Sequence, residues 1–506
     1  MATTTTEPTI RPEVRTRASA AAGPSHTKRW WILAILGIAQ LMVVLDATIV
    51  NIALPTAQKD LGFSNDARQW IVTAYALAFG SLLLLGGRIA DVFGRKWVFL
   101  IGLVGFALAS AVGGAAVNVG MLIGARAVQG MFAALLAPAI LSLLTTTFHE
   151  PAERAKAFGI FGAIAGAGGS IGLLLGGVLT EYANWRWTLY VNLIFAAIAL
   201  AGGYVLLSHS KAAHRAKMDL PGTVVVSAGL FALVYGFSHA ETDGWANGVT
   251  VGLLVAAGVL LTTFVVMQQR SRNPLLPLRI VLDRNRGGAF LAMFASAAGM
   301  FAVFLFLTYY MQASLGYSAI QSGAGFLPMM GALIVTSSVV STRLVTKVSA
   351  KLLIPVGMVI SAAGMYLLTF LDLSSGYVGH ILPALLVVGV GMGMVFATGF
   401  GLATLGVDAS DSGVASATVN TMQQVGGSVG TALLNTIAAT AATSYVTSHL
   451  GSGPAQLVAA NAAVHSYTTS FWWAAGIFAV GAVISALVLR PGVPQFEDEL
   501  AGAVVL

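Results

Sequence analysis

The sequence contains no cysteine, so disulfide bonds and thiolate metal sites are excluded. Charged residues are also scarce. They make up 9% of the 506 residues, whereas a soluble protein carries about 25%. Hydrophobic residues make up 57% of the chain, and many form runs long enough to cross a bilayer, which takes about 20 residues of helix. These proportions predict an all-α polytopic membrane protein.

The chemistry of enzymes is missing as well. Histidine is the usual proton carrier near neutral pH, yet every histidine falls in a predicted tail, loop or span end. The segment 168–172 fits a nucleophile-elbow pattern, but no intramembrane histidine could activate Ser170. No phosphate-binding loop is present, so we do not expect ATP to supply energy. We therefore expect no enzyme activity, no metal and no cofactor.

The apolar runs predict fourteen transmembrane helices. Residues 1–29 precede them and are rich in Thr, Ala, Pro and Arg, so they are predicted to form a disordered tail. The spans are placed at residues 30–54, 69–87, 97–116, 119–146, 157–180, 187–207, 220–238, 249–269, 288–312, 323–344, 352–371, 379–402, 413–441 and 471–489.

The basic residues predict how these spans are oriented. An even number of spans puts both termini on one side, and the segments on that side hold every lysine and arginine except Lys59, Arg68, Arg126 and Arg186. Basic residues concentrate in the cytoplasmic loops of membrane proteins, so we expect both termini in the cytoplasm. The formal net charge of +7 follows from these loops and does not indicate a nucleic-acid partner.

An internal repeat predicts two bundles of helices. The loop after the second span and the loop after the tenth align at Arg88 with Arg343 and at Lys96 with Lys351. Duplicated halves are typical of membrane transporters. The extra pair of helices between the halves lacks the polar side chains of a translocation route, so we expect it at the edge of the bundles. The predicted tail, six-helix bundle, linker with the extra pair, second six-helix bundle and tail occupy residues 1–29, 30–207, 208–286, 287–490 and 491–506.

One acidic residue, Asp46, lies deep in the first span. A carboxylate there costs roughly 3 kcal/mol on insertion scales, so it needs a proton, a cation or a wet cavity. From their positions in the first and fourth spans, Asp46 and Arg126 both lie about 10–12 Å below the same surface. Gln129 lies one helical turn from Arg126. The residues alone leave two interpretations open, a proton carrier and a static ion pair that fixes helix packing.

Three motifs resemble those of a known family. The segment Gly87-x-Ile-Ala-Asp91-x-x-Gly94-Arg95-Lys96 resembles the signature loop of the major facilitator superfamily. The segments from Leu45 to Pro55 and from Leu122 to Ala134 resemble the first-span and fourth-span motifs of its fourteen-span drug:proton antiporters, the EmrB/QacA type. The resemblance implies the major facilitator fold and proton-driven export of amphipathic small molecules. It also implies that Asp46, Arg126 and Gln129 couple protons to transport.

The signature loop predicts a conformational role. Gly87 and Gly94 permit a tight turn, and Asp91 can bind a helix end or a basic partner. We therefore predict that Asp91, with Arg95 and Lys96, forms a latch that holds the outward-open form. The alternative is a solvated loop whose charges only obey the rule for cytoplasmic loops.

The fifth span matches the family's antiporter motif only in part. Gly168, Gly172, Gly176 and Gly177 are present, but Leu173 occupies the position of the usual proline. Three of the glycines recur every four residues, so we expect a smooth face that lets another helix approach closely. The missing proline predicts the loss of a kink. Plain helix packing would explain the glycines equally well.

The substrate cavity is predicted mainly in the ninth and thirteenth spans. Methionine and aromatic side chains, concentrated in spans 9 to 13, form an adaptable apolar surface, and amides can orient a ligand. Roles in packing or against lipid fit each of these side chains equally well. The candidate cavity residues are Asn51, Tyr309, Tyr310, Gln312, Asn420, Gln423 and Gln424.

These observations predict a monomeric, proton-coupled exporter in a plasma membrane, of the bacterial inner-membrane kind, whose partners are an amphipathic small molecule, protons and membrane lipids. Two alternatives remain. A transporter of the same fold could carry a lipid-like substrate that enters from the side of the bundle. A non-transporting sensor could bind a ligand in the membrane, but it would have no need of Asp46 there.

Overall fold

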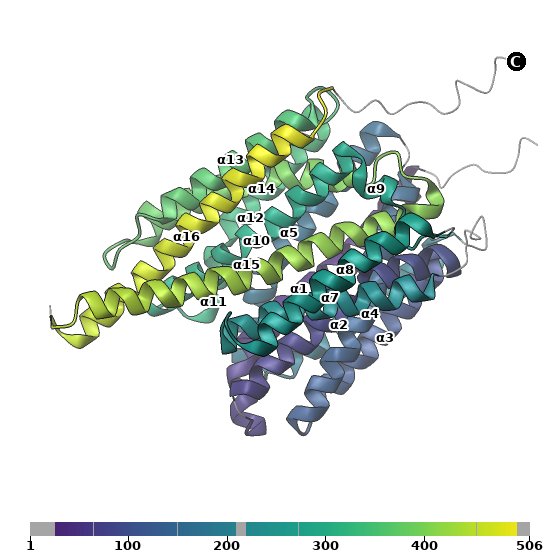
Figure 1. The fold of residues 1–506 in the computed structure, drawn as a ribbon. Coiled ribbons are helices and arrows are strands. Elements are labelled where there is room, and N and C mark those ends of the chain that lie inside the picture. Colours follow the sequence, from purple (N-terminus) through teal and green to yellow (C-terminus); the bar gives the residue numbers. More distant parts are fainter. Residues whose placement is uncertain are drawn as a thin grey trace, which may run out of the picture.

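The computed structural model describes residues 26–63, 65–148, 150–208, 219–271, 273–451 and 453–492. Within these residues all secondary structure is helical (Figure 1). Thirteen helices are long and apolar enough to cross a membrane, and the bent helix α5 is the fourteenth. Counting bent α5 as one span gives the fourteen spans that were predicted. Most of the two predicted tails, and the basic stretch 209–218, lie outside the described residues.

The helices follow the predicted order of six, two and six spans. Helices of both bundles satisfy their backbone hydrogen bonds internally, which a bilayer requires. The first bundle contains α1 (His26–Leu61), α2 (Asn65–Phe93), α3 (Arg95–Gly114), α4 (Val119–Thr147), α5 (Pro151–Tyr182) and α6 (Trp187–Leu206). The extra pair is α7 (Leu220–Asp243) and α8 (Gly248–Arg270). The linker continues with the short helix α9 (Leu278–Leu282). The second bundle contains α10 (Arg284–Ala313), α11 (Ala319–Gly325), α12 (Leu327–Val339), η2 (Val340–Leu344), α13 (Ala350–Leu368), η3 (Tyr377–Ile381), α14 (Leu382–Ala403), η4 (Ala409–Asp411), α15 (Ser412–Ser448) and α16 (Ala455–Val488).

Polar side chains in the loops explain where several helices begin. Asn118 accepts a hydrogen bond from the Met121 amide at the start of α4, and Asp219 accepts one from Gly222 at the start of α7. Asp283 caps α10 in the same way. Such caps satisfy backbone N–H groups that have no partner inside the helix. They place each span start at the edge of its apolar run.

Three local predictions were wrong. The second span was predicted to end at residue 87, but α2 continues to Phe93, so most of the signature loop is helical. The last span was predicted to begin at residue 471, but its helix begins at Ala455 because the preceding alanine-rich segment continues the helix. A kink was expected to be lost with the proline of the fifth span, but α5 bends by 41° between its segments Ala152–Gly169 and Ile171–Tyr182. Glycines in this segment allow the bend without proline.

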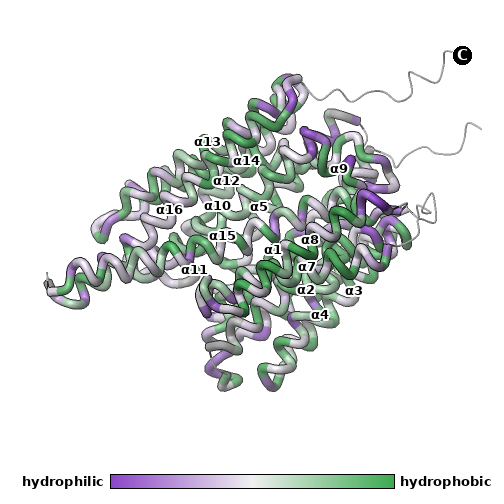
Figure 2. The backbone as a smooth tube through the Cα atoms, in the orientation of Figure 1, coloured by the Kyte–Doolittle hydropathy of each residue, from purple (hydrophilic) through white to green (hydrophobic). Residues whose placement is uncertain are grey.

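Both ends of the described chain lie at the same end of the molecule. At the start of α1, Arg29 pairs with Glu153 at the start of α5, with an N–O distance of 2.8 Å. The end of α16 lies against the start of α10, where Arg284 donates to the Val488 carbonyl. Hydrophilic residues gather at the helix ends there, while the middles of the helices are hydrophobic (Figure 2). We call this the basic end, because the basic loops predicted to be cytoplasmic connect helices there.

The two bundles meet along two sides. On one side α2 packs against α15, and on the other α5 packs against α12 and α14. Helix α7 contacts both α2 and α15, so the α7–α8 pair covers the first side from outside. Away from the basic end, the ends of α1 to α4 and of α15 and α16 point apart (Figure 1). In the described part of the chain, the hydrogen bonds between the two six-helix bundles lie in the basic half, while α5 also packs against α11 in the other half.

Helix packing inside the first bundle yields a prediction. A Cβ atom on Gly86 would lie 1.9 Å from the Ala134 carbonyl oxygen of α4. Because neither backbone can yield without moving a helix, Gly86→Ala should destabilise the protein by about 1–3 kcal/mol, measured by thermal unfolding in detergent. Gly124→Ala, in an exposed helical position with nothing within 4 Å of its Cβ, should be neutral or stabilise by up to about 1 kcal/mol. Equal stability of the two variants would show that α2 and α4 are not in such close contact.

Candidate functional site

Asp46 is completely buried and lies at the centre of a hydrogen-bond network. Its Oδ2 accepts from Arg126 Nη1 of α4 at 2.6 Å. Its Oδ1 accepts from Gln129 Nε2 of α4 and from Asn192 Nδ2 of α6, both at 2.7 Å. Arg126 Nη1 also donates to Gln129 Oε1 at 2.7 Å. The structure thus confirms that the three residues predicted to couple protons lie together.

Three further residues complete the network and were not predicted. Ser110 of α3 accepts from Gln129 Nε2 at 2.6 Å and from Asn192 Nδ2 at 3.2 Å. Tyr75 of α2 lies under Arg126, whose guanidinium carbon is 4.2 Å from the ring centroid. Asn192 is the only amide in an otherwise apolar α6, and that isolation was a usable signal. Ser110 and Tyr75 carry no such signal, because serine and tyrosine are common in transmembrane helices.

Asp46 and Arg126 form a buried ion pair between α1 and α4. Asp46 and Arg126 have side-chain exposures of 0% and 2%, so water does not screen their attraction. The carboxylate accepts hydrogen bonds from one charged donor and two neutral donors. The ion pair therefore joins α1 directly to α4 inside the first bundle.

The glycines of α5 form a close contact with α1. A Cβ on Gly172 would clash with Thr48 and with the Leu45 carbonyl, and one on Gly176 would lie 2.9 Å from the Ile49 carbonyl oxygen. Gly168 meets Val44 in the same way. The predicted smooth face of α5 therefore packs on the part of α1 that carries Asp46. Gly177 faces elsewhere, toward Ile320 of the second bundle.

A second polar cluster joins the bundles at the basic end. The Asp91 carboxylate of α2 accepts hydrogen bonds from the amides of Gly413 (3.0 Å) and Val414 (3.2 Å). These amides belong to the first turn of α15, where unpaired N–H groups and the helix dipole favour a negative charge. Asp91 therefore crosses from the first bundle to the second, as a latch would require.

The other residues of the signature loop serve this contact in different ways. Gly87 lies within α2 and not in a turn as predicted, and its missing side chain is needed because a Cβ would lie 2.5 Å from the Gly413 carbonyl oxygen. Gly94 has a φ of 94°, so it does make the predicted turn into α3. Arg95 donates to Asp91 at 3.4 Å. Lys96 lies away from the interface, where it donates to the Tyr204 and Leu207 carbonyls of α6.

Three more contacts join the bundles in the basic half, and none was predicted. Arg154 of α5 donates to the carbonyl (3.1 Å) and the hydroxyl (3.0 Å) of Thr404, which caps the C-terminus of α14. Ser142 and Ser412 share a hydrogen bond of 2.7 Å. The Ser337 hydroxyl donates to the Gly159 carbonyl at 2.7 Å. Short hydroxyl side chains of this kind give no pattern in a sequence, because each bonds to whatever backbone is near.

The linker after α8 strengthens the same region. Arg279 pairs with Asp408 and Asp411 in the connection between α14 and α15. Burial raises the pKa of Asp411, while the charges of Arg279 and Arg88 counter that rise. The connection is therefore held by both the first bundle and the linker.

Comparisons with known proteins agree with this architecture. The family model described as Major Facilitator Superfamily matches residues 36–431. The chain belongs to the major facilitator superfamily. The puromycin resistance protein pur8 of Streptomyces alboniger is 46% identical over 494 residues, which cover 97% of each chain. The cephamycin export protein CmcT of Amycolatopsis lactamdurans is 40% identical over 79% of this chain and 83% of its own.

A solved structure supports the fold independently. The human organic anion transporter MFSD10 (TETRAN) superposes with a TM-score of 0.62 at 14% identity, over 90% of this chain and 99% of its own. A similarity at such low identity concerns the fold alone. Membership of the superfamily makes this chain a transporter rather than an enzyme, and a multi-pass protein of a bacterial cell membrane.

The residues predicted to line the substrate cavity lie in different environments. Tyr310 is fully buried and donates to the Asp372 and Ser375 carbonyls, so it fixes a loop. Asn420 is buried too and donates to Ser416 of its own helix. Tyr309 is 47% exposed. Gln312, Gln423 and Gln424 are partly buried, and the side chain of Asn51 lies outside the described residues.

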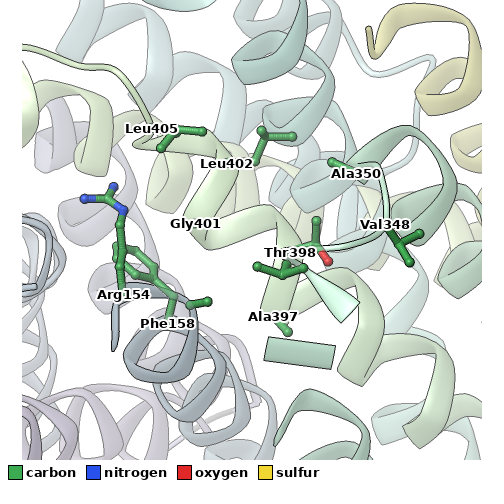
Figure 3. Close-up of a pocket in the computed structure, with 11 residues that line it drawn as sticks. Arg154, Phe158, Val348, Ala350, Ala397, Thr398, Gly401, Leu402 and Leu405 are labelled. Atoms are coloured by element: carbon green, nitrogen blue, oxygen red, sulfur yellow. The ribbon is translucent and has the colours of Figure 1, made fainter. Parts of the chain in front are cut away.

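A pocket opens between the bundles at the basic end (Figure 3). It contains about 460 Å³ of space, part of it open to solvent. Phe158 and the stem of Arg154 line it from α5, and Thr398, Gly401 and Leu402 line it from α14. Nearly all of its wall is apolar, and it lies beside the Arg154–Thr404 contact rather than near Asp46. It therefore lies at the contact between the two bundles and away from the Asp46–Arg126 pair.

The buried pair yields a prediction about stability. Arg126→Ala leaves Asp46 without its charged partner, and breaking a buried pair in this way costs about 3–5 kcal/mol. Adding Asp46→Asn to that variant should recover most of the loss, because the amide carries no charge that needs a partner. Thermal unfolding of the two single variants and the double variant measures the coupling between the residues. Additive effects would contradict a direct interaction.

The latch yields a second prediction. Asp91→Asn removes a charge at the start of α15 worth about 0.3–2 kcal/mol, so the form closed at the basic end should become less populated. Since the chain has no cysteine, spin labels can be attached to cysteines at the exposed positions Tyr182 and Leu450. Double electron–electron resonance should then show shorter distances between the bundles at the opposite end.

The matched control is Asp283→Asn. Asp283 also accepts amide hydrogen bonds at a helix start, but within one bundle. It should leave the distances unchanged. A latch role for Asp91 is contradicted if both variants behave like the unmodified protein.

Proposed function

We propose that this protein is a proton-coupled antiporter that exports amphipathic small molecules by alternating access. The observation that carries the proposal is the Asp46–Arg126 pair, buried in the membrane-spanning part of the first bundle and bonded at 2.6 Å. A buried acid is costly in a membrane, and such acids commonly mark proton pathways. The kinship with an antibiotic resistance protein and an antibiotic export protein supports export as the direction of transport.

In this proposal the basic end faces the cytoplasm, since basic loops are retained on that side of the membrane. In the described part of the chain, the hydrogen bonds that join the two six-helix bundles lie in the basic half. The structure would then represent a state closed toward the cytoplasm. Asp91 and Arg154 hold this state, and the exporter must release both contacts before it can load substrate from the cell.

Protonation reaches these contacts through α5. When Asp46 takes up a proton, its attraction to Arg126 weakens, and α1 is freer to move relative to α4. Helix α5 must follow α1, because the glycine contacts at Gly172 and Gly176 leave no space between the two backbones. The same helix carries Arg154 and Gly159, which bond to the second bundle. A proton bound at Asp46 can thus change the contact between the bundles.

The substrate proposed is an amphipathic molecule with at most one charge. The membrane-spanning helices of the second bundle carry no carboxylate in their interiors, so a multiply charged cation would find no counter-charge there. Methionine and aromatic residues of these helices supply apolar surface. We propose that the transporter works as a monomer among membrane lipids and uses the proton gradient alone, with no cofactor.

The test is transport into proteoliposomes under an imposed pH gradient. Puromycin is a suitable first probe because of the relative that bears its name, and a panel should include neutral, cationic and lipid-like compounds. Asp46→Asn should keep the fold, because the amide has the same shape and removes a buried charge. It should reduce gradient-driven transport to the level of empty vesicles.

The matched control is Asp60→Asn in the same helix. Asp60 is an exposed residue that pairs with Arg186 at the far end of α1, so this variant should transport normally. Full gradient-driven transport by Asp46→Asn would remove that residue from the mechanism. Transport of lipid-like compounds only would favour the lipid transporter over the drug exporter.

A further inference from the structure

The side-chain amide of Asn192 uses its NH₂ group in hydrogen bonds but not its oxygen. Its Nδ2 donates to Asp46 Oδ1 at 2.7 Å and to Ser110 Oγ at 3.2 Å, which uses both of its hydrogens. Its Oδ1 is buried and has no hydrogen-bond partner. Burying an amide oxygen without a partner is costly. The residue is fully buried, and in the described part of the chain no protein group donates to this oxygen.

A protonated Asp46 would need a hydrogen-bond acceptor, and Asn192 Oδ1 is an acceptor without a partner. In the network seen here every group bonded to the carboxylate is a donor: Arg126, Gln129 and Asn192. A carboxylic acid has an O–H of its own, which must find an acceptor when it is buried. Ser110 already accepts from both amides, so its own hydroxyl hydrogen also lacks an acceptor in this network.

Gln129 cannot easily become that acceptor. Its Oε1 is engaged by Arg126 at 2.7 Å, so turning its amide would break a charge-assisted hydrogen bond and point an NH₂ group at a guanidinium. Asn192 has no hydrogen bond to Arg126 that the same rotation would break. Its free oxygen and its NH₂ group exchange places, and one amide atom remains without a partner in either orientation. Once Asp46 is protonated, the rotation therefore breaks no charge-assisted hydrogen bond.

We propose that Asn192 is a positioning residue for the proton, whose amide rotates so that it donates to Asp46 when the acid is charged and accepts from it when the acid is protonated. In the second orientation the proton taken up from water sits on Asp46 Oδ1. The Asn192 N–H bond to Oδ1 is replaced by an O–H bond from Oδ1 to the amide oxygen, and the Ser110 hydroxyl can donate to that same oxygen. The inference rests on the proposed proton coupling through Asp46.

The surroundings of Asp46 leave this role to Asn192. The neighbouring helices α2, α3, α4 and α6 contribute Tyr75, Ser110, Arg126, Gln129 and Asn192, and Arg126 is the charged group among these. Helix α5 presents glycines there. Among the described residues that donate hydrogen bonds to Asp46, Asn192 is the one whose own acceptor atom, Oδ1, has no partner.

Infrared difference spectroscopy of the purified protein between alkaline and acidic pH tests the proposal. The C=O stretch of protonated Asp46 is the band that disappears in Asp46→Asn. In Asn192→Leu, which has a similar shape and no amide, this band should move to higher wavenumber because the acid O–H has lost its acceptor. The midpoint of its appearance should move up by about one pH unit, since a bond to a charged group is stronger than one to a neutral group.

Rescue and transport provide further readouts. Asn192→Thr keeps a hydroxyl that can both donate and accept, so its band and midpoint should stay close to those of the unmodified protein. Turnover of gradient-driven transport should fall about tenfold in Asn192→Leu, matching a shift of one pH unit, with the KM for substrate unchanged. If Asn192→Leu does not fold, Asn192→Ala removes the same amide and carries the same expectation.

Each outcome decides one question. An Asp46 band that keeps its wavenumber and midpoint in Asn192→Leu overturns the role of Asn192, even if stability changes, because a merely structural residue would change only stability. Loss of rescue in Asn192→Thr, with the band shifted as in the leucine variant, overturns the dual donor and acceptor role. If no band depends on Asp46 at all, the proposed proton coupling itself fails, independently of Asn192.

Discussion

The burial of Asp46 against Arg126 is the constraint on which the rest of the structure depends. Neither charge can be left alone in an apolar interior, where breaking such a pair costs about 3–5 kcal/mol. Four helices supply the bonding groups: α1 the acid, α4 Arg126 and Gln129, α3 Ser110 and α6 Asn192. While the acid is charged, these helices are held in one arrangement. The first bundle therefore behaves as one body held together by this network.

The path from Asp46 to the contact with the second bundle is short. Helix α5 carries no charge near Asp46, but it lies against α1 without space for a methyl group at Gly172. Its other side meets α12 and α14 of the second bundle. A glycine face transmits displacement better than a face of long side chains, because close-packed backbones cannot absorb a shift by changing rotamers. This explains why α5 keeps its glycines although it has lost the usual proline.

The sequence predicted the parts of this arrangement that leave a strong pattern. An acid and a base in apolar spans are so costly that their depths alone paired Asp46 with Arg126, and charge asymmetry set the number of spans. It could not find Ser110, Ser142 or Ser412, whose hydroxyls are indistinguishable from those that bond to their own helix. Tyr310 looked like a ligand contact for the opposite reason, since an aromatic hydroxyl serves a loop carbonyl or a substrate equally well. Such choices depend on which helices become neighbours.

The connection between α14 and α15 shows how the closed state can be both specific and reversible. Arg154 lies at the C-terminus of α14 and Asp91 at the N-terminus of α15, so each charge faces the helix end of opposite partial charge. Each such contact is worth about 0.3–2 kcal/mol. One unit of pH difference across a membrane supplies about 1.4 kcal/mol per proton. The free energy of each contact is therefore of the same size as this driving force. In the proposed mechanism one proton can then shift the balance, whereas a buried ion pair across the interface would resist opening.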